Sequence, residues 1–310
     1  MSRPLVIGSR GSKLALWQAE QARERLLRLT PQIDIRIEII KTTGDVKSEP
    51  LSVIGGKGVF TKELEDALLD GRIDLAVHSL KDLPTILPDE LFISAICERE
   101  DGRDALVLRS DLRIEDSSLM NLPVGAVVGT SSQRRLAQLK ALRNDVTVTD
   151  LRGNVDTRIR KLDEGQYDAV ILASAGLVRL GLQNRISARI AVTEMLPAVG
   201  QGAIAIETRS DNEFAVEKTS KLDHGETRLA CLAERAFLRG LGGGCQLPIA
   251  AHARIDGDVI DLDGLVAKPD GSEIWRDRLS GSLNDVEQIG SALATKLIER
   301  GASTFPMEAR

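Results

Sequence analysis

The chain of 310 residues is 42% apolar and 28% charged, with a formal net charge of −5 at pH 7. This length suits two or three globular domains, and the acidic balance argues against nucleic-acid binding. Five Phe, two Trp and one Tyr are too few for a stacking platform, and the three cysteines fit neither a disulfide scaffold nor a zinc site.

The first predicted lobe alternates strands and helices. An apolar run at residues 5–7 enters the turn Gly8-Ser9-Arg10, and apolar residues at helical spacing follow over 14–29. Residues 33–39 alternate like a strand. A helix is expected at 61–69 and a strand at 74–79.

The same order of elements returns from residue 124. A strand at 124–128 enters a Gly/Ser/Thr turn, and a helix at 136–142, a strand at 146–150, a helix at 155–162 and a strand at 168–173 follow. The repeat predicts two related α/β lobes with mainly parallel sheets.

The chain is expected to cross between the lobes twice. Apolar strands at 92–97 and 105–108 flank a charged stretch, and the chain returns through 192–197 and 203–207. A smaller α+β unit follows, with helices at 227–238 and 286–300 around three strand-like runs. We therefore place domain 1 at 1–100 and 201–220, domain 2 at 101–200 and domain 3 at 221–310.

Arginines recur where strands are expected to end, which is the edge where such lobes bind ligands. They are Arg10, Arg134, Arg135, Arg152, Arg158 and Arg179. A single one of these is most simply a solvated surface residue. Together they predict a site for carboxylates, because a guanidinium group binds a carboxylate through two parallel hydrogen bonds.

One acid and one thiol stand out. Asp82 follows the strand at 74–79 in His78-Ser79-Leu80-Lys81-Asp82-Leu83-Pro84, and is either a turn cap or a group that stabilises a cation or carries a proton. We interpret His78 as a buried strand residue. Cys245 follows three glycines in a loop and is a candidate attachment point or nucleophile, whereas Cys97 and Cys231 are expected in cores.

Several stretches together resemble the porphobilinogen deaminase (hydroxymethylbilane synthase) family. They are Gly8-Ser9-Arg10, Leu14-Ala15-Leu16-Trp17-Gln18, Gly55-Gly56-Lys57-Gly58-Val59-Phe60, His78-Ser79-Leu80-Lys81-Asp82-Leu83-Pro84, Gly129-Thr130-Ser131-Ser132-Gln133-Arg134-Arg135, Leu151-Arg152-Gly153-Asn154-Val155, Leu196-Pro197-Ala198-Val199-Gly200-Gln201-Gly202 and Gly243-Gly244-Cys245-Gln246-Leu247-Pro248. The resemblance implies two lobes like those of periplasmic binding proteins, a third domain, and a transferase that joins four porphobilinogen molecules head to tail with release of ammonia.

The resemblance also implies roles for particular residues. Cys245 would carry a dipyrromethane cofactor by a thioether bond, and Asp82 would be the catalytic aspartate, with the proton for the leaving ammonia coming from Asp82 or from a bound water. Cofactor or substrate contacts are implied for Arg10, Ser79, Lys81, Thr130, Ser131, Ser132, Arg134, Arg135, Arg152, Arg158, Arg179, Gln201 and Gly202. Lys57 and Phe60 would belong to a mobile loop over the site.

Two alternatives stay open, a two-lobe receptor for a polycarboxylate and an inactive relative. The first ten residues lack the apolar core of a signal peptide, and no apolar run approaches the ~18 residues of a membrane span. We therefore expect a cytoplasmic monomer that binds porphobilinogen and needs no metal, membrane or nucleic acid.

Overall fold

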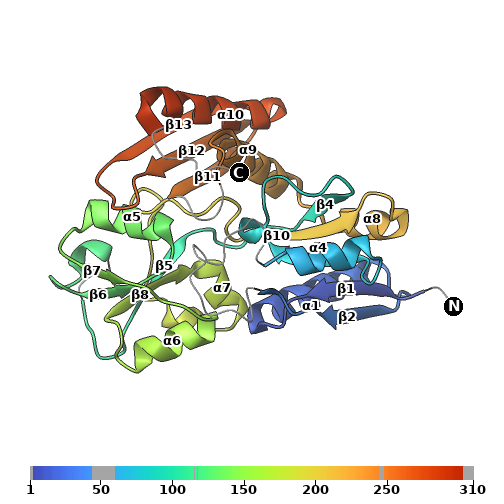
Figure 1. Ribbon diagram of the computed structural model, residues 1–310, viewed down its shortest axis with the longest axis horizontal. Coiled ribbons are helices and arrows are strands. Elements are labelled where there is room, and N and C mark those ends of the chain that lie inside the picture. The colour runs from blue at the N-terminus through green and yellow to red at the C-terminus, as the bar shows by residue number, and fades with distance from the viewer. Residues whose placement is uncertain (1–2, 44–59, 115, 117, 244–247, 303–310) are drawn as a thin grey trace. The chain divides into compact units, whose positions relative to one another are not determined.

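The computed structural model describes residues 3–43, 60–114, 116, 118–243 and 248–302 (Figure 1). The contacts within the chain divide it into two compact units. Unit 1 comprises Met1–Glu100 and Ala203–Arg228, and unit 2 comprises Asp101–Gly202 and Leu229–Arg310. Cys245 and Lys57 lie outside the described residues.

Unit 1 contains a five-stranded sheet in the order β2-β1-β3-β10-β4. Its strands are β1 (Leu5–Ser9), β2 (Ile35–Ile39), β3 (Leu75–Ser79), β4 (Leu91–Ile96) and β10 (Ile204–Arg209). Strand β1 is parallel to β2 and β3, whereas β10 is antiparallel to β3 and β4. The carboxyl ends of β1 and β3 therefore lie at the same edge of the sheet.

Helices cover both faces of this sheet. They are α1 (Lys13–Leu29), α4 (Lys62–Leu69) and α8 (Glu213–Thr219). Small and aliphatic residues of α1 and α8 pack with Leu5 and Ile7, and α4 packs on the opposite face against Ile73 and Ala76. Gly8 allows this close approach, because a Cβ atom there would lie 2.3 Å from the Ile73 side chain.

Unit 2 contains a second five-stranded sheet, in the order β7-β6-β8-β5-β9. Its strands are β5 (Asp104–Leu108), β6 (Val127–Gly129), β7 (Thr147–Thr149), β8 (Ala169–Ala173) and β9 (Ala188–Arg189). Its helices are α5 (Gln133–Leu142), α6 (Val155–Asp163) and α7 (Ser174–Arg179). As in unit 1, the second strand in the sheet order lies between two parallel neighbours and the fourth is antiparallel to both of its neighbours. In unit 2 these strands are β6 and β5.

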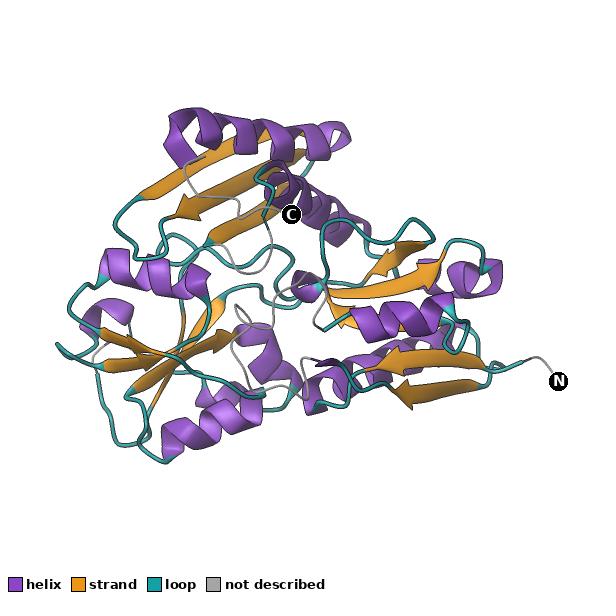
Figure 2. Cartoon of the chain, in the orientation of Figure 1, coloured by secondary structure: helices purple, strands orange, loops and turns teal. Residues whose placement is uncertain are grey.

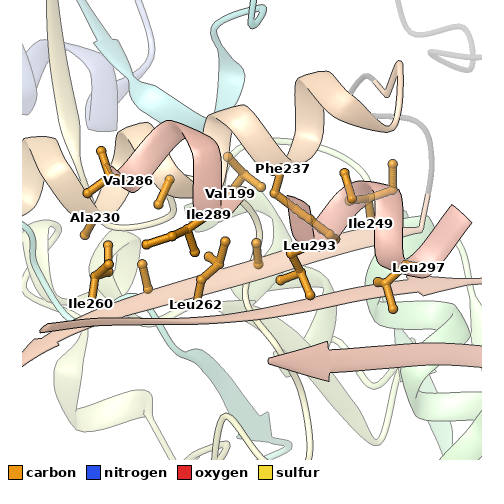
Figure 3. Close-up of a cluster of buried hydrophobic side chains, with 14 of the residues drawn as sticks. Val199, Ala230, Phe237, Ile249, Ile260, Leu262, Val286, Ile289, Leu293 and Leu297 are labelled. Atoms are coloured by element: carbon orange, nitrogen blue, oxygen red, sulfur yellow. The ribbon is translucent and has the colours of Figure 1, made fainter. Parts of the chain in front are cut away.

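Unit 2 also contains the C-terminal part of the chain, where helices pack on one sheet. The antiparallel strands β11 (Ile249–Asp256), β12 (Val259–Ala267) and β13 (Ile274–Ser282) form the sheet, and α10 (Val286–Leu297) packs with α9 (Gly225–Gly240) over a core that includes Phe237, Leu262 and Leu293 (Figure 3). All three of these residues are 0% exposed. Figure 2 shows helices lying beside the strands of each sheet.

The expected α/β class is confirmed, and two features differ from the sequence predictions. The short helices α7 and α8 were not expected, because six or seven residues show too little periodicity to be recognised. In addition, the sheets are mainly parallel as predicted, but each contains one reversed strand that was not expected. Strand β10 in unit 1 and strand β5 in unit 2 are antiparallel to both of their neighbours. The separation of domain 3 from domain 2 stays a prediction.

Candidate active site

In unit 1 the polar candidates follow β1 and β3 at the shared sheet edge. Arg10 follows β1 and lies over Phe60, with its guanidinium carbon 4.3 Å from the ring centroid. Ser12 then caps α1 by accepting a hydrogen bond from the N–H of Ala15. Gln18 of α1 donates from Nε2 to Ser79 Oγ at 2.9 Å, so the start of α1 is tied to the end of β3.

Asp82 is held by the backbone of a short turn. Residues Leu80–Asp82 form a 3₁₀ turn directly after β3, and the N–H of Leu80 donates to the carbonyl of Ala203 on the neighbouring return segment. Leu80 and Leu83 are 1% and 3% exposed and anchor both ends of the turn. The carboxylate of Asp82 is half-buried between these anchors.

His78 is buried, as expected, and lies on β3 with its Nε2 atom 2.9 Å from Oε2 of the buried Glu207. Glu65 of α4 is close to this pair. Burial raises the pKa of Glu65 more than the nearby Thr61 hydroxyl lowers it, and the charge of Glu207 adds to the increase. Cys97 and Cys231 are also buried, in agreement with the sequence prediction.

In unit 2 the turn after β6 is joined to the loop after β7. Thr130 donates its N–H to the carbonyl of Thr149, and Thr130 Oγ1 accepts from the N–H of Ser132. Ser131 Oγ donates to the carbonyl of Leu151 at 2.6 Å and accepts from the N–H of the same residue. Two segments that are distant in sequence thus present their polar side chains at one sheet edge.

Arg152 and Arg158 both belong to this joined region. Arg152 pairs through Nε with Asp150 at 2.5 Å, and Arg158 donates from Nε to the carbonyl of Gly153 at 2.7 Å. Burial would raise the pKa of Asp150, but the neighbouring Ser131 hydroxyl and the hydrogen bond and charge of Arg152 outweigh it and lower the pKa. Asp150, which sequence reasoning missed, therefore stays ionised and holds the Arg152 guanidinium group.

Arg134 and Arg135 point into the protein and are each 5% exposed. Both pair with Asp104, the first residue of β5, at 2.6 Å and 2.7 Å, and Asp104 is 0% exposed. Burial alone would raise the pKa of Asp104, but the two guanidinium charges hold it well below its usual value. The sequence suggested substrate contacts for these arginines and gave no sign of their common buried partner.

Gln201 and Arg179 lie around the segment where the chain leaves unit 2. Gln201 donates from Nε2 to Asp104 Oδ1 at 2.9 Å and to the carbonyl of Gly102 at 2.8 Å. Arg179, at the end of α7, donates to the carbonyl of Gly202 at 2.6 Å. Gly202 has a φ of +92°, a conformation that favours glycine.

The two units thus offer different chemistry at equivalent strand ends. Unit 1 presents a carboxylate, a lysine and a stacked arginine, whereas unit 2 presents hydroxyl groups and arginines. Among the described residues no group of His, Cys, Asp and Glu side chains could hold a metal ion, and no helix is long and apolar enough to cross a membrane.

Two family models match the chain. One is described as porphobilinogen deaminase, dipyromethane cofactor binding domain, and matches residues 5–217; the other, porphobilinogen deaminase, C-terminal domain, matches residues 228–299. A porphobilinogen deaminase of Pelotomaculum thermopropionicum is 49% identical, over 100% of this chain and 98% of its own. One of Chromobacterium violaceum is 50% identical, over 96% of this chain and 95% of its own.

Solved structures match much more weakly. The second substrate binding domain of a putative amino acid ABC transporter from Streptococcus pneumoniae is 13% identical and covers 77% of this chain and 95% of its own, with a TM-score of 0.45.

Proposed function

The chain belongs to the porphobilinogen deaminase family, and we propose which of its residues carry out the reaction of that family. The enzyme is a transferase of tetrapyrrole biosynthesis that condenses four porphobilinogen molecules into hydroxymethylbilane. In each condensation the C–N bond of the aminomethyl group breaks and ammonia leaves. The free α-carbon of the terminal pyrrole then forms a C–C bond to the methylene carbon and loses its proton.

The observation that carries the assignment of residues is the buried arginine pair. Arg134, Arg135 and Asp104 together carry a net charge of +1 in a buried position, at the N-terminus of α5 where the helix dipole is also positive. Arg134 Nε is buried and meets no hydrogen-bond partner among the described residues. A buried excess of positive charge with an open donor is suited to an anion.

This donor set fits the dipyrromethane cofactor of the family, whose acetate and propionate groups are anions. When bound, the cofactor supplies the primer from which the chain grows. We propose that Arg134 and Arg135 bind its carboxylates, that Thr130, Ser131 and Ser132 donate hydrogen bonds, and that Cys245, which lies outside the described residues, forms the thioether.

Each added pyrrole brings two more carboxylates, so recognition needs further cations. We assign Arg10, Lys81, Arg152, Arg158 and Arg179 to this role. The pairing of Arg152 with Asp150 supports it, because a substrate carboxylate would replace a carboxylate already bound to the same guanidinium group. Gln201 and Gly202, beside Arg179, complete the proposed set.

Asp82 is assigned to the chemical step. Loss of ammonia leaves an electron-poor azafulvene cation, and an ionised carboxylate stabilises that cation and accepts hydrogen bonds from the pyrrole N–H groups. The protonated carboxyl can also donate the proton that the leaving ammonia requires. The short turn between Leu80 and Leu83 supports this role, because it fixes the half-buried carboxylate relative to β3.

We further propose that the enzyme is a cytoplasmic monomer that needs no metal ion, membrane or nucleic acid. Size-exclusion chromatography with light scattering measures the oligomeric state, and activity after treatment with a chelator measures the dependence on metal. A stable dimer or a loss of activity on chelation would contradict these two statements.

The experiment that tests the function combines intact mass with turnover of porphobilinogen. We expect a purified protein heavier than its polypeptide by one dipyrromethane, and a Cys245→Ser variant with the bare polypeptide mass and no turnover. Cys97→Ala, which removes a buried thiol of unit 1, is the control and should keep the adduct. A wild-type protein that binds polycarboxylates reversibly but gains no adduct would instead be a receptor.

A further inference from the structure

One carboxylate in unit 2 contacts three of the proposed binding residues. Asp104 Oδ2 accepts from Arg134 Nη1 at 2.6 Å, and Oδ1 accepts from Arg135 Nη2 at 2.7 Å and from Gln201 Nε2 at 2.9 Å. Longer contacts reach Oδ1 from Arg134 Nη2 at 3.3 Å and from Arg135 Nε at 3.1 Å. Both oxygens of Asp104 are therefore fully engaged in holding these side chains.

The position of Asp104 itself is fixed by the sheet. It is the first residue of β5 and pairs with Ala173 of β8, and its carbonyl accepts from the N–H of Ile190. It is 0% exposed. Because the backbone of Asp104 cannot shift without disturbing two strand pairings, its carboxylate is a rigid reference point for the side chains that bind it.

Backbone carbonyls hold the outer edges of the same guanidinium groups. Arg134 Nη1 also donates to the carbonyl of Leu196 at 2.8 Å, and Arg135 Nη1 donates to that of Ile171 at 2.9 Å. Gln138, one turn further along α5, binds Leu196 through both its amide atoms. These contacts set the plane of each guanidinium group, and Arg134 Nε remains as the donor without a partner among the described residues.

Two adjacent buried cations would repel each other without a common anion. Asp104 neutralises one charge of the pair and leaves one, so it draws the guanidinium groups together while preserving a net attraction for a carboxylate. Replacing a water shell by such fixed charges is the usual means by which a protein prepares a binding site before the ligand arrives.

We propose that Asp104 is a positioning residue for the reaction: it orients Arg134, Arg135 and Gln201 so that they bind the carboxylate side groups of the pyrrole units. The inference rests on the proposed function of the two arginines. Asp104 itself does not touch the substrate, and it acts only through the side chains that it holds.

Two substitutions separate positioning from simple stability. Asp104→Asn removes the charge but keeps the shape, and Asp104→Glu keeps the charge but moves the carboxylate by about 1.5 Å, the length of one C–C bond. A displacement of about 1 Å in a binding group can cost up to about 100-fold in rate. We expect both variants to raise the KM for porphobilinogen about ten-fold or more, and purified Asp104→Asn to contain a fraction without cofactor by intact mass.

The control is Asp74→Asn in unit 1. Asp74 directly precedes β3 and is also a buried aspartate, 3% exposed. Its carboxylate accepts hydrogen bonds from the N–H of Val6 and from the side-chain amide of Asn212. We expect this variant to melt at a lower temperature with an unchanged KM. All variants are compared with the wild type by thermal melting, intact mass and the separate determination of kcat and KM.

The results separate this inference from the proposed function. If the wild-type protein shows no turnover, the proposed function is wrong. If the wild type turns over and the Asp104 variants keep its KM, with only a lower melting temperature or kcat, Asp104 is a purely structural residue and this inference is overturned. If Asp104→Asn does not fold, Asp104→Glu decides, because it retains the charge that the ion pairs require.

Discussion

Replacing Asp82 by Asn tests the proposed chemistry most directly. Asp82 is half-buried in a turn anchored by Leu80 and Leu83. In such a partly buried position an effective dielectric constant of about 20 applies, so a charge about 4 Å away interacts with the carboxylate by about 4 kcal/mol. If this interaction is made only in the transition state, its loss lowers kcat by about 10³-fold, since about 1.4 kcal/mol corresponds to a factor of ten.

The assay is the initial rate of hydroxymethylbilane formation at saturating porphobilinogen, expressed per adduct-bearing enzyme as counted by intact mass. The KM should change little, because the carboxylates of the substrate are bound by other residues. Asp89→Asn is the control, since Asp89 is an exposed carboxylate in the connection that follows the turn. An Asp82→Asn protein that keeps more than about a tenth of the wild-type kcat would refute the assignment of Asp82 to the transition state.

Three other predictions address binding and stability. Arg152→Ala should raise the KM and change the mass distribution of enzyme-bound intermediates, whereas Arg160→Ala, which removes an exposed arginine of α6, should not; identical distributions would count against a role in elongation. Phe237→Ala should lower the free energy of unfolding by about 3–5 kcal/mol in urea denaturation, because the ring is 0% exposed; a loss below about 1 kcal/mol would mean that this core is not packed as described. The raised pKa of Glu65 means that its protonated form is favoured by folding, so its contribution to stability is complete below its ordinary pKa of 4.5 and is lost as pH rises through the raised value. Glu65→Gln should therefore lose less stability than the wild type as pH rises above the ordinary pKa of 4.5, and parallel pH profiles would contradict the shift.

Helices and strands could be predicted from the sequence where the pattern of apolar residues extends over many positions. Apolar residues at helical spacing over 14–29 predicted α1, and the structure buries three of them, Ala19, Ala22 and Leu26, on one face. The edge where Arg10 and Asp82 lie was predictable as well, because both follow strands that were predicted to be parallel and so to end at the same edge of the sheet. The antiparallel direction of β5 and β10 was not predictable, since strand direction depends on the path of the whole chain and not on local pattern.

The environment of the arginines was the main feature that the sequence could not provide. Arginine is rarely buried, so each one is first interpreted as a surface residue. Arg134 and Arg135 are buried because Asp104 accepts both, and that residue lies 30 positions before Arg134 in the chain. Asp104 ended a charged stretch before an apolar run, a pattern that is common at strand ends, so only the three-dimensional pairing distinguishes it from Asp101 or Asp111.

The repeated architecture explains why an acidic side chain follows β3 and a cationic side chain follows β8. Strand β3 is parallel to its neighbour β1, and β8 is parallel to its neighbour β6, so the strands of each pair end at the same edge of their sheet. After β3 the chain makes a 3₁₀ turn that ends at Asp82, whereas after β8 it forms α7, which ends at Arg179.

The difference follows from the local sequence. Pro84 cannot donate a backbone hydrogen bond, so the segment after β3 cannot continue as a helix through that position, and the carboxylate stays on a turn. The segment after β8 has no proline and continues for six helical residues, which carries its cation to the buried carbonyl of Gly202. The repeated supersecondary unit thus provides a half-buried acid after β3 and a buried guanidinium group after β8.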